Sequence, residues 1–237
     1  MRFGLNTLLF FITSLFTYAL IPQATAYPTV LVLGDSLAEG YGLKSEESFP
    51  SLMKKELIKI GYTDAHIINA GISGSTSASG LFRLNYHLKE HLKKENLVQK
   101  SNKPTHLVLE LGANDGLRGL SVESLEKNLT QVIQKAKENQ ITVILCGMKM
   151  PTSYGKDYTK KYESTFDRVA QKTKVAYIPF LLEGVAGNPS LNQADGIHPT
   201  FEGQKILAKN VLKKLIPLLS SPQKIKPQPK EANLYGK

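Results

Sequence analysis

The sequence contains a single cysteine, Cys146, among its 237 residues. One cysteine cannot form an intramolecular disulfide, and there is no cysteine cluster to hold a zinc ion. Because 41% of the residues are hydrophobic and only 12 are proline, the composition also excludes a disordered chain and a collagen-like fibre. Cys146 lies in an apolar run, so we expect a buried core thiol rather than a nucleophile.

The sequence also lacks an apolar run long enough to span a membrane, which takes about 20 residues. The run from Leu8 to Leu20 has 13 residues, follows Arg2, and precedes Ala24-Thr25-Ala26. A basic start, a short apolar stretch and an A-x-A pattern are typical of a secretory signal. We predict a signal peptide over residues 1–26, cleaved before Tyr27, with an uncleaved N-terminal anchor as the alternative. The mature protein is therefore expected to be exported, to the periplasm or outside the cell.

Acidic residues are outnumbered, and the formal net charge is +10. The segment from Ser221 to Lys237 contributes four lysines against one glutamate, has three prolines and contains few apolar residues. We predict that 221–237 is a disordered basic tail and that 27–220 is one domain. Within that domain the lysines are scattered without interleaved aromatic residues, which argues against nucleic-acid binding. The charge permits weak peripheral attraction to an anionic membrane surface, and no obligate protein partner is implied.

Five short apolar runs are spaced along the domain, and four of them end at or just before a glycine. Runs without strict alternation are typical of parallel strands that are buried on both faces. The predicted strands are Thr29–Leu33, His66–Ala70, His106–Leu111, Ile141–Cys146 and Val175–Pro179.

Helical spacing of apolar residues fills the segments between these runs. Pro50 and Pro199 are placed to begin two helices, and Ser121 is a candidate N-cap. Alternating strands and helices predict one α/β domain, with a doubly wound, five-stranded parallel sheet covered by helices on both faces. In such sheets ligands bind beyond the carboxyl ends of the strands, so the segments that follow the strands are the places to look for chemistry.

Phosphate-loop, dinucleotide-binding and G-x-S-x-G motifs are all absent. The first strand is instead followed by Gly34-Asp35-Ser36-Leu37. A serine at a strand-to-helix turn can expose its hydroxyl as a nucleophile and direct its own N–H toward a substrate. The alternative is that Ser36 is an ordinary cap or turn residue.

Two later strand ends carry candidate donors for an oxyanion. The small residues of Gly71–Ser77 let a ligand approach the backbone, which makes the Gly74 N–H a candidate donor. In Gly112–Gly116 the uncharged amide of Asn114 can donate to a tetrahedral intermediate. Taken singly, these segments also read as a flexible polar loop and as Asn-Asp-Gly turn chemistry.

A candidate base and its orienting carboxylate lie near the end of the domain. Asp195 and His198 are three residues apart, which lets the carboxylate reach the imidazole and stabilise its charged form. The alternative is a structural histidine before Pro199. Together with Ser36, Gly74 and Asn114, this pair completes the set of groups required for acyl transfer.

These segments resemble the motifs of the SGNH (GDSL) hydrolase family. The four named residues of the family correspond to Ser36 in GDSL, Gly74 in ISGSTS, Asn114 in GAND and His198 in DGIHP, and Asp195 corresponds to its triad acid. The likeness runs from about Thr29 to Pro217 and favours the bacterial periplasmic thioesterase I, lysophospholipase L1 and arylesterase branch. It implies a flavodoxin-like fold and a serine hydrolase whose substrates are small-molecule acyl esters and thioesters, with an acyl-serine intermediate and no metal or cofactor.

The sequence departs from the family pattern at two positions and leaves three features open. Ala113 replaces a common second glycine, and Ser75 stands where the branch often has aspartate. The segment Met148–Tyr158 resembles the substrate-side loop of the branch, which implies an acyl channel lined by Met148, Met150, Pro151 and Tyr154; ordinary loop packing is the alternative. Glu110, in the third strand, has no role that the sequence explains. A carbohydrate or peptidoglycan O-acetyl esterase and a non-catalytic flavodoxin-like binding module remain as alternative functions.

Overall fold

A computed structural model describes residues 28–94 and 103–220. The predicted signal peptide and the predicted basic tail lie outside this described part. The expected architecture is confirmed, because five parallel strands form one sheet in the order β2-β1-β3-β4-β5. The strands agree with the predicted ones to within one residue at each end and are β1 Thr29–Gly34, β2 His66–Gly71, β3 His106–Glu110, β4 Thr142–Cys146 and β5 Ala176–Ile178.

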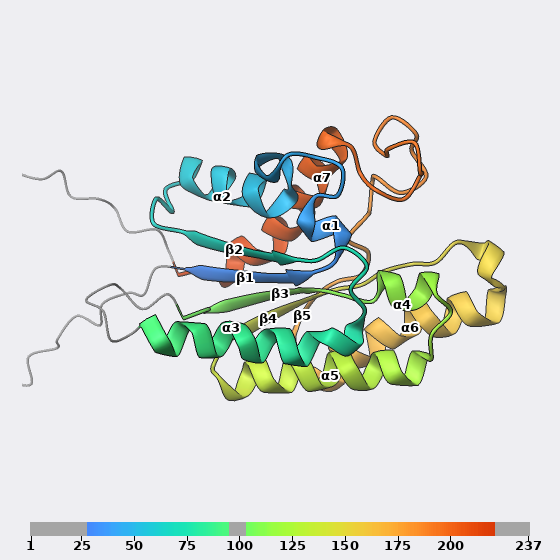
Figure 1. The fold of residues 1–237 in the computed structure, drawn as a ribbon, viewed down its shortest axis with the longest axis horizontal. Helices are drawn as coiled ribbons and strands as arrows, with labels where there is room; N and C mark the ends of the chain where they lie inside the picture. The colour runs from blue at the N-terminus through green and yellow to red at the C-terminus, as the bar shows by residue number, and fades with distance from the viewer. Residues whose placement is uncertain (1–27, 95–102, 221–237) are drawn as a thin grey trace, which may run out of the picture.

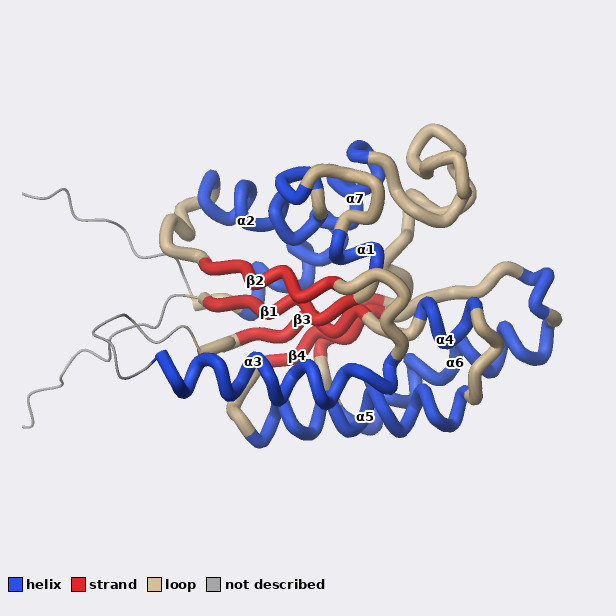
Figure 2. Tube along the Cα trace, in the orientation of Figure 1, coloured by secondary structure: helices blue, strands red, loops and turns tan. Residues whose placement is uncertain are grey.

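Helices cover both faces of the sheet (Figure 1). Helices α1, α2 and α7 lie over one face, and α3, α5 and α6 lie over the other, with α4 near the carboxyl ends of the strands (Figure 2). The helices are α1 Ser36–Glu39, α2 Phe49–Lys59, α3 Gly80–Lys94, α4 Ala113–Leu117, α5 Val122–Glu138, α6 Lys156–Thr173 and α7 Phe201–Leu215. Four 3₁₀ turns complete them, at Ser45–Glu47, Ser77–Ser79, Thr152–Tyr154 and Ile216–Leu218. In the described part of the chain, no helix has the length and apolar character needed to cross a bilayer.

The predicted helix starts are right in one case and shifted in two. Ser121 caps α5 by accepting a hydrogen bond from the Ser124 N–H. Helix α2 begins at Phe49, so Pro50 lies inside its first turn. The prediction that Pro199 begins the last helix is wrong, because Pro199 pairs with Asn192 in an isolated antiparallel bridge. Thr200 caps α7 instead, which leaves Pro199 in the extended stretch that follows His198.

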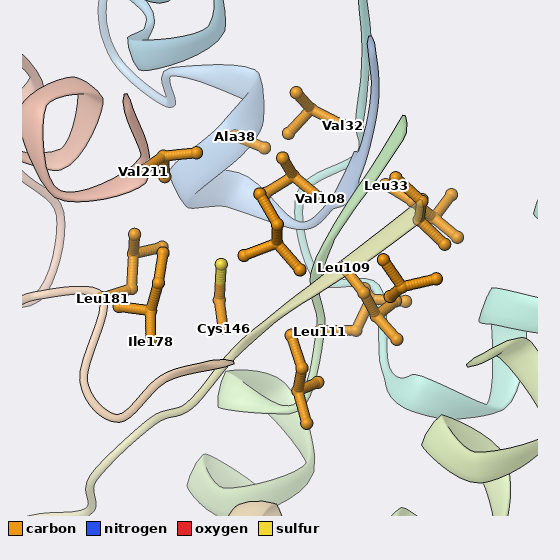
Figure 3. Packing of buried hydrophobic residues seen from close by; sticks show 14 of the residues in the cluster. Val32, Leu33, Ala38, Val108, Leu109, Leu111, Cys146, Ile178, Leu181 and Val211 are labelled. Atoms are coloured by element: carbon orange, nitrogen blue, oxygen red, sulfur yellow. The ribbon is translucent and has the colours of Figure 1, made fainter. Parts of the chain in front are cut away.

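The core consists of two apolar layers, one on each face of the sheet. In the register of β1 with β3, Val32 lies level with Val108 and Leu33 with Leu109. Successive side chains of a strand point to opposite faces, so these two pairs belong to different layers (Figure 3). All four side chains are fully buried, as expected of parallel strands covered on both sides.

Cys146 lies at the end of β4, inside this core, near Ile178 and Leu181 (Figure 3). Its side chain is 1% exposed, and burial raises the pKa of the thiol well above its usual range. A protonated, inaccessible thiol is neither a nucleophile nor a metal ligand. Cys146 is therefore a core residue, as predicted.

The strand order defines where a ligand can bind. β1 lies between β2 and β3, so the connection that leaves β1 and the connection that leaves β3 run to opposite sides. This divergence opens a crevice beyond the carboxyl ends of the two strands. The turn with Ser36 follows β1 and the turn with Asn114 follows β3, so both residues lie at this crevice.

Candidate active site

Ser36 is the first residue of the short helix α1, directly after β1. Asp35 caps this helix, and its Oδ1 accepts a hydrogen bond of 3.1 Å from the Leu37 N–H. The N–H of a first helical residue has no partner within the helix, so the Ser36 N–H can serve a ligand. The turn is tightly packed from below, because a Cβ on Gly34 would lie 2.3 Å from Oε2 of Glu110. A side chain at position 34 would therefore displace the turn that presents Ser36.

His198 lies between Ser36 and Asp195 and contacts both. Its Nε2 is 2.9 Å from Oγ of Ser36, and its Nδ1 is 2.7 Å from Oδ2 of Asp195. Hydrogen bonds from the side chain and backbone of His198 lower the pKa of Asp195 to about 2. An ionised Asp195 holds the proton of the imidazole on Nδ1 and leaves Nε2 to accept the proton of the serine.

The loop that carries His198 is held by contacts that the sequence did not reveal. The Gln193 N–H donates to the His198 carbonyl at 2.7 Å, and the Gln193 side chain donates to the Tyr41 carbonyl at 2.7 Å. The Tyr41 ring lies against the imidazole, with 4.5 Å between the ring centroids. Tyr41 and Gln193 are 152 positions apart in the chain, and neither belongs to a recognisable motif, so only the folded structure brings them to the site.

Ser36, Gly74 and Asn114 line one cavity together with His198. Within residues 28–94 and 103–220, the N–H of Gly74 has no hydrogen-bond acceptor, so it remains available to an oxyanion. The Asn114 amide differs, because its Nδ2 donates to Oδ2 of Asp35 at 3.2 Å and to the Ser75 carbonyl at 3.1 Å. An oxyanion must therefore share or displace one of these two acceptors. Ser75 contacts Asn114 through its backbone carbonyl. This contact does not depend on the side chain at position 75, so an aspartate is not required there.

The loop Gly71–Ser77 is tied down along its length. Ser77 donates from its N–H and its hydroxyl to the buried carboxylate of Asp115, at 2.8 and 2.5 Å. The Gly74 carbonyl accepts a hydrogen bond of 2.9 Å from Arg118, and the Ser73 N–H donates to Glu39 at 2.6 Å. These bonds hold the Gly74 peptide in one orientation, so the segment is not the flexible polar loop that was the alternative from sequence.

A buried polar cluster beneath Ser36 gives Glu110 the role that the sequence left open. Oε2 of Glu110 accepts a hydrogen bond of 3.0 Å from the Asp35 N–H. Oε1 accepts none within the described residues, which leaves that oxygen to carry a proton. Arg83, from α3, donates to the carbonyls of Gly34 and Ala70. The strand-to-helix turn is thus held by side chains from β3 and α3.

Burial sets the protonation of this cluster. Burial first, and the nearby Asp35 second, raise the pKa of Glu110 well above its usual range. Burial also raises the pKa of Asp35 to about 6, against the lowering effect of its hydrogen bonds with Leu37, Glu110 and Asn114. Around neutral pH the pair therefore holds one proton, on Glu110, and Asp35 carries the charge that Asn114 faces.

Glu110→Gln should make the stability of the protein less dependent on pH. Native Glu110 keeps its proton, whereas in the unfolded chain it ionises above about pH 4.5, so the native state binds more protons and stability falls as pH rises. The neutral amide cannot contribute to this fall. Urea denaturation at pH 4.5, 5.5 and 7 should show a smaller loss of unfolding free energy for the variant, and Glu183→Gln, which changes an exposed carboxyl, should behave as wild type. An identical pH slope in all three proteins would contradict the protonated state of Glu110.

The cavity has a volume of about 750 Å³ and a mostly apolar wall. Met148, Met150 and Pro151, which the family resemblance implied, are among its lining residues. Tyr154 is not among them; its hydroxyl donates to the carbonyl of the lining residue Leu117 at 3.2 Å.

Other lining residues were not anticipated. Phe180 and Leu182 follow β5, and Lys149 lies between the two methionines. The rule that ligands bind beyond strand ends points to the segment after β5, but it does not single out these side chains.

Comparison with known proteins gives a consistent result. A family model described as the GDSL-like lipase/acylhydrolase family matches residues 32–206. The chain is 41% identical to esterase TesA of Pseudomonas aeruginosa over 200 residues. The matched region covers 84% of this chain and 94% of that protein. It is 34% identical over 206 residues to thioesterase 1/protease 1/lysophospholipase L1 of Escherichia coli, covering 87% and 92%.

A solved structure is similar in the same way. The psychrotrophic esterase EstA from Pseudoalteromonas sp., in a structure inhibited by monoethylphosphonate, matches with a TM-score of 0.71 and 32% identity. The match covers 80% of this chain and 97% of that one.

Proposed function

Because this chain belongs to the GDSL-like lipase/acylhydrolase family, and is an enzyme that hydrolyses acyl esters and thioesters, we propose that Ser36 is its nucleophile, His198 its general base and Asp195 the residue that orients the base. The observation that carries this assignment is the chain of contacts from Ser36 Oγ to His198 Nε2, at 2.9 Å, and from His198 Nδ1 to Asp195 Oδ2, at 2.7 Å. Both distances are within the range in which a proton passes between heavy atoms.

The first half of the proposed reaction forms an acyl-enzyme. Oγ of Ser36 attacks the acyl carbonyl carbon while Nε2 of His198 takes the hydroxyl proton. The negative charge that develops on the carbonyl oxygen is stabilised by the N–H groups of Ser36 and Gly74 and by the Asn114 amide. The tetrahedral intermediate then collapses, and the alcohol or thiol leaves with the proton from His198.

The second half returns the enzyme to its starting state. His198 takes a proton from a water molecule, and the resulting hydroxide attacks the acyl carbon on Ser36. Collapse of this intermediate releases the carboxylic acid, and Oγ recovers its proton from the imidazole. In both halves Asp195 stabilises the imidazolium without taking its proton.

The cavity supports a medium or long acyl chain rather than an acetyl group. A volume of about 750 Å³ with a mostly apolar lining is typical of pockets that enclose whole organic ligands. An acetyl group would leave most of that wall in contact with water. Each methylene buried from water contributes about 0.8 kcal/mol, so a chain that fills the pocket gains binding energy that acetyl cannot.

The kcat/KM for 4-nitrophenyl esters should rise by about tenfold or more between acetyl and octanoyl. Leu182→Ala should lower the octanoyl value and leave the acetyl value nearly unchanged, because only the longer chain reaches that wall. Ile60→Ala, at an exposed site at the C-terminal end of α2, is the matched control. Fastest turnover of the acetyl ester would instead favour the O-acetyl esterase alternative.

We also propose that residues 1–26 are a signal peptide, that the mature domain is exported, and that residues 221–237 are a tail outside the domain. The support for export is the order of a basic start, a short apolar stretch and the Ala24-Thr25-Ala26 pattern.

A further inference from the structure

Lys149 extends from the segment after β4, at the wall of the substrate cavity. Its neighbours Met148 and Met150 are buried, whereas Lys149 is exposed. The Nζ of Lys149 lies 5.1 Å from the centre of the Phe180 ring, and both side chains line the cavity. The aromatic face therefore supports the ammonium group at the cavity rim.

The ammonium of Lys149 has no counter-charge of its own. Among the residues that line the cavity, Lys149 is the only one with a permanently charged side chain, and none is aspartate or glutamate. No carboxylate in residues 28–94 and 103–220 lies within ion-pairing distance of Lys149. Its charge is thus left for a group that enters the cavity.

The other charged groups near the cavity lie behind its lining residues. Arg118 adds a second positive charge, because it donates to the carbonyl of the lining residue Gly74. Three carboxylates stand behind the lining residues: Glu39 accepts a hydrogen bond from Ser73, Asp35 from Asn114 and Asp195 from His198. An anion at the rim therefore meets the ammonium of Lys149 directly, whereas these carboxylates are separated from it by the lining residues.

We propose that Lys149 forms a subsite for a negatively charged group of the substrate, a phosphate or a carboxylate. This inference rests on the proposed function and adds the substrate class: acyl esters or thioesters that carry an anion, either on the leaving group or at the far end of the acyl chain. A neutral ester fills only the apolar part of the cavity. An anionic one also forms a charge-assisted hydrogen bond with the ammonium.

The two sources of the anion can be separated with matched substrates. For the leaving group, 4-nitro-3-(octanoyloxy)benzoate is compared with 2-nitrophenyl octanoate, which lacks only the carboxylate. For the chain end, the 4-nitrophenyl monoester of octanedioic acid is compared with 4-nitrophenyl octanoate. Lys149→Met removes the charge at nearly constant length, Lys149→Arg keeps it, and Lys54→Met removes an exposed lysine from α2 as the control.

Lys149→Met should lower kcat/KM for the anionic ester of one pair by about tenfold, mainly through KM, and change both neutral esters by less than about twofold. Lys149→Arg and Lys54→Met should behave as wild type, and 0.5 M salt should weaken the preference of the wild type for the anionic ester. The pair that responds identifies where the anion lies. If neither pair responds to the loss of Lys149, the subsite does not exist.

Binding of octyl phosphate, followed by calorimetry, provides a readout that does not depend on turnover. Its Kd should rise about tenfold in Lys149→Met and remain unchanged in Lys54→Met, whereas octanol should bind all proteins alike. Equal binding of octyl phosphate to wild type and Lys149→Met overturns the subsite even if the esters are hydrolysed. Lys149-dependent binding by a protein that hydrolyses none of the four esters would retain the subsite and reject the proposed function.

Discussion

Replacing Ser36 with alanine is expected to lower kcat for 4-nitrophenyl octanoate by about 10⁴- to 10⁶-fold. Without the hydroxyl no acyl-serine can form, and His198 loses the group from which it takes a proton. Within the described residues, the only hydrogen bond of the Ser36 side chain is the one that its hydroxyl donates to Nε2 of His198, so its removal should leave the fold intact. Circular dichroism and the midpoint of urea denaturation check that the variant is folded. The fall in kcat is measured by comparing the hydrolysis of 4-nitrophenyl octanoate by the variant and the wild type.

Two controls make the Ser36 result specific. Ser153→Ala changes an exposed serine in the 3₁₀ turn Thr152–Tyr154, close to the cavity but outside its lining, and should keep full activity. An alkyl fluorophosphonate should add one phosphonyl group to the wild type and none to Ser36→Ala, as located by mass spectrometry. A folded Ser36→Ala protein with wild-type kcat would refute the assignment of the nucleophile.

Replacing Asn114 with alanine is expected to lower kcat by about 10²- to 10³-fold, with a smaller change in KM. In the proposed mechanism the amide donates to charge that exists mainly in the transition state, so its loss should affect turnover more than binding of the ester. The structure adds a second consequence, because the amide also donates to Asp35, and this bond lowers the pKa of that carboxyl. The pKa of Asp35 should therefore rise above its value of about 6 in the variant.

The Asn114 measurement needs a control for the loss of any partly buried amide. Asn139→Ala removes a side chain that donates to the Lys135 carbonyl at the end of α5 that leads into the amino end of β4, at the edge of the sheet opposite to Asn114, and should leave kcat unchanged. The two variants are compared by kcat and KM on the same octanoyl ester. An unchanged kcat for Asn114→Ala would place this residue outside the oxyanion hole.

The hydrogen bonds of the Asn114 amide orient the side chain within the site. The amide nitrogen donates to Asp35 and to the Ser75 carbonyl. These two bonds fix the orientation of the side chain and occupy both of its hydrogens. A developing oxyanion carries more charge than the Ser75 carbonyl and can draw one hydrogen toward itself. The Gly74 N–H has no such acceptor in the described part of the chain, so the two proposed oxyanion donors differ in whether they must give up a hydrogen bond.

Much of the fold could be predicted from local sequence alone. A parallel strand covered on both faces must be apolar throughout, so the run that became β3 could be recognised without knowing its neighbours. The same reasoning failed for the start of α7, where Pro199 pairs with Asn192 across a bridge. A proline suits either a first helical turn or an extended stretch, and only the bridging partner decides between them.

The sequence by itself determined which chemical groups are present and that they follow strand ends. Ser36, Gly74, Asn114 and His198 could be found in this way because a doubly wound sheet brings the carboxyl ends of its strands to one edge. Contacts between residues far apart in the chain needed the folded structure, as for Ser36 and His198, which are 162 positions apart. The contact of the Tyr41 ring with the imidazole is of this kind. So is the absence of a carboxylate beside Lys149 among the residues that line the cavity. Both depend on distances that no local pattern encodes, because they arise only when separate loops pack against each other.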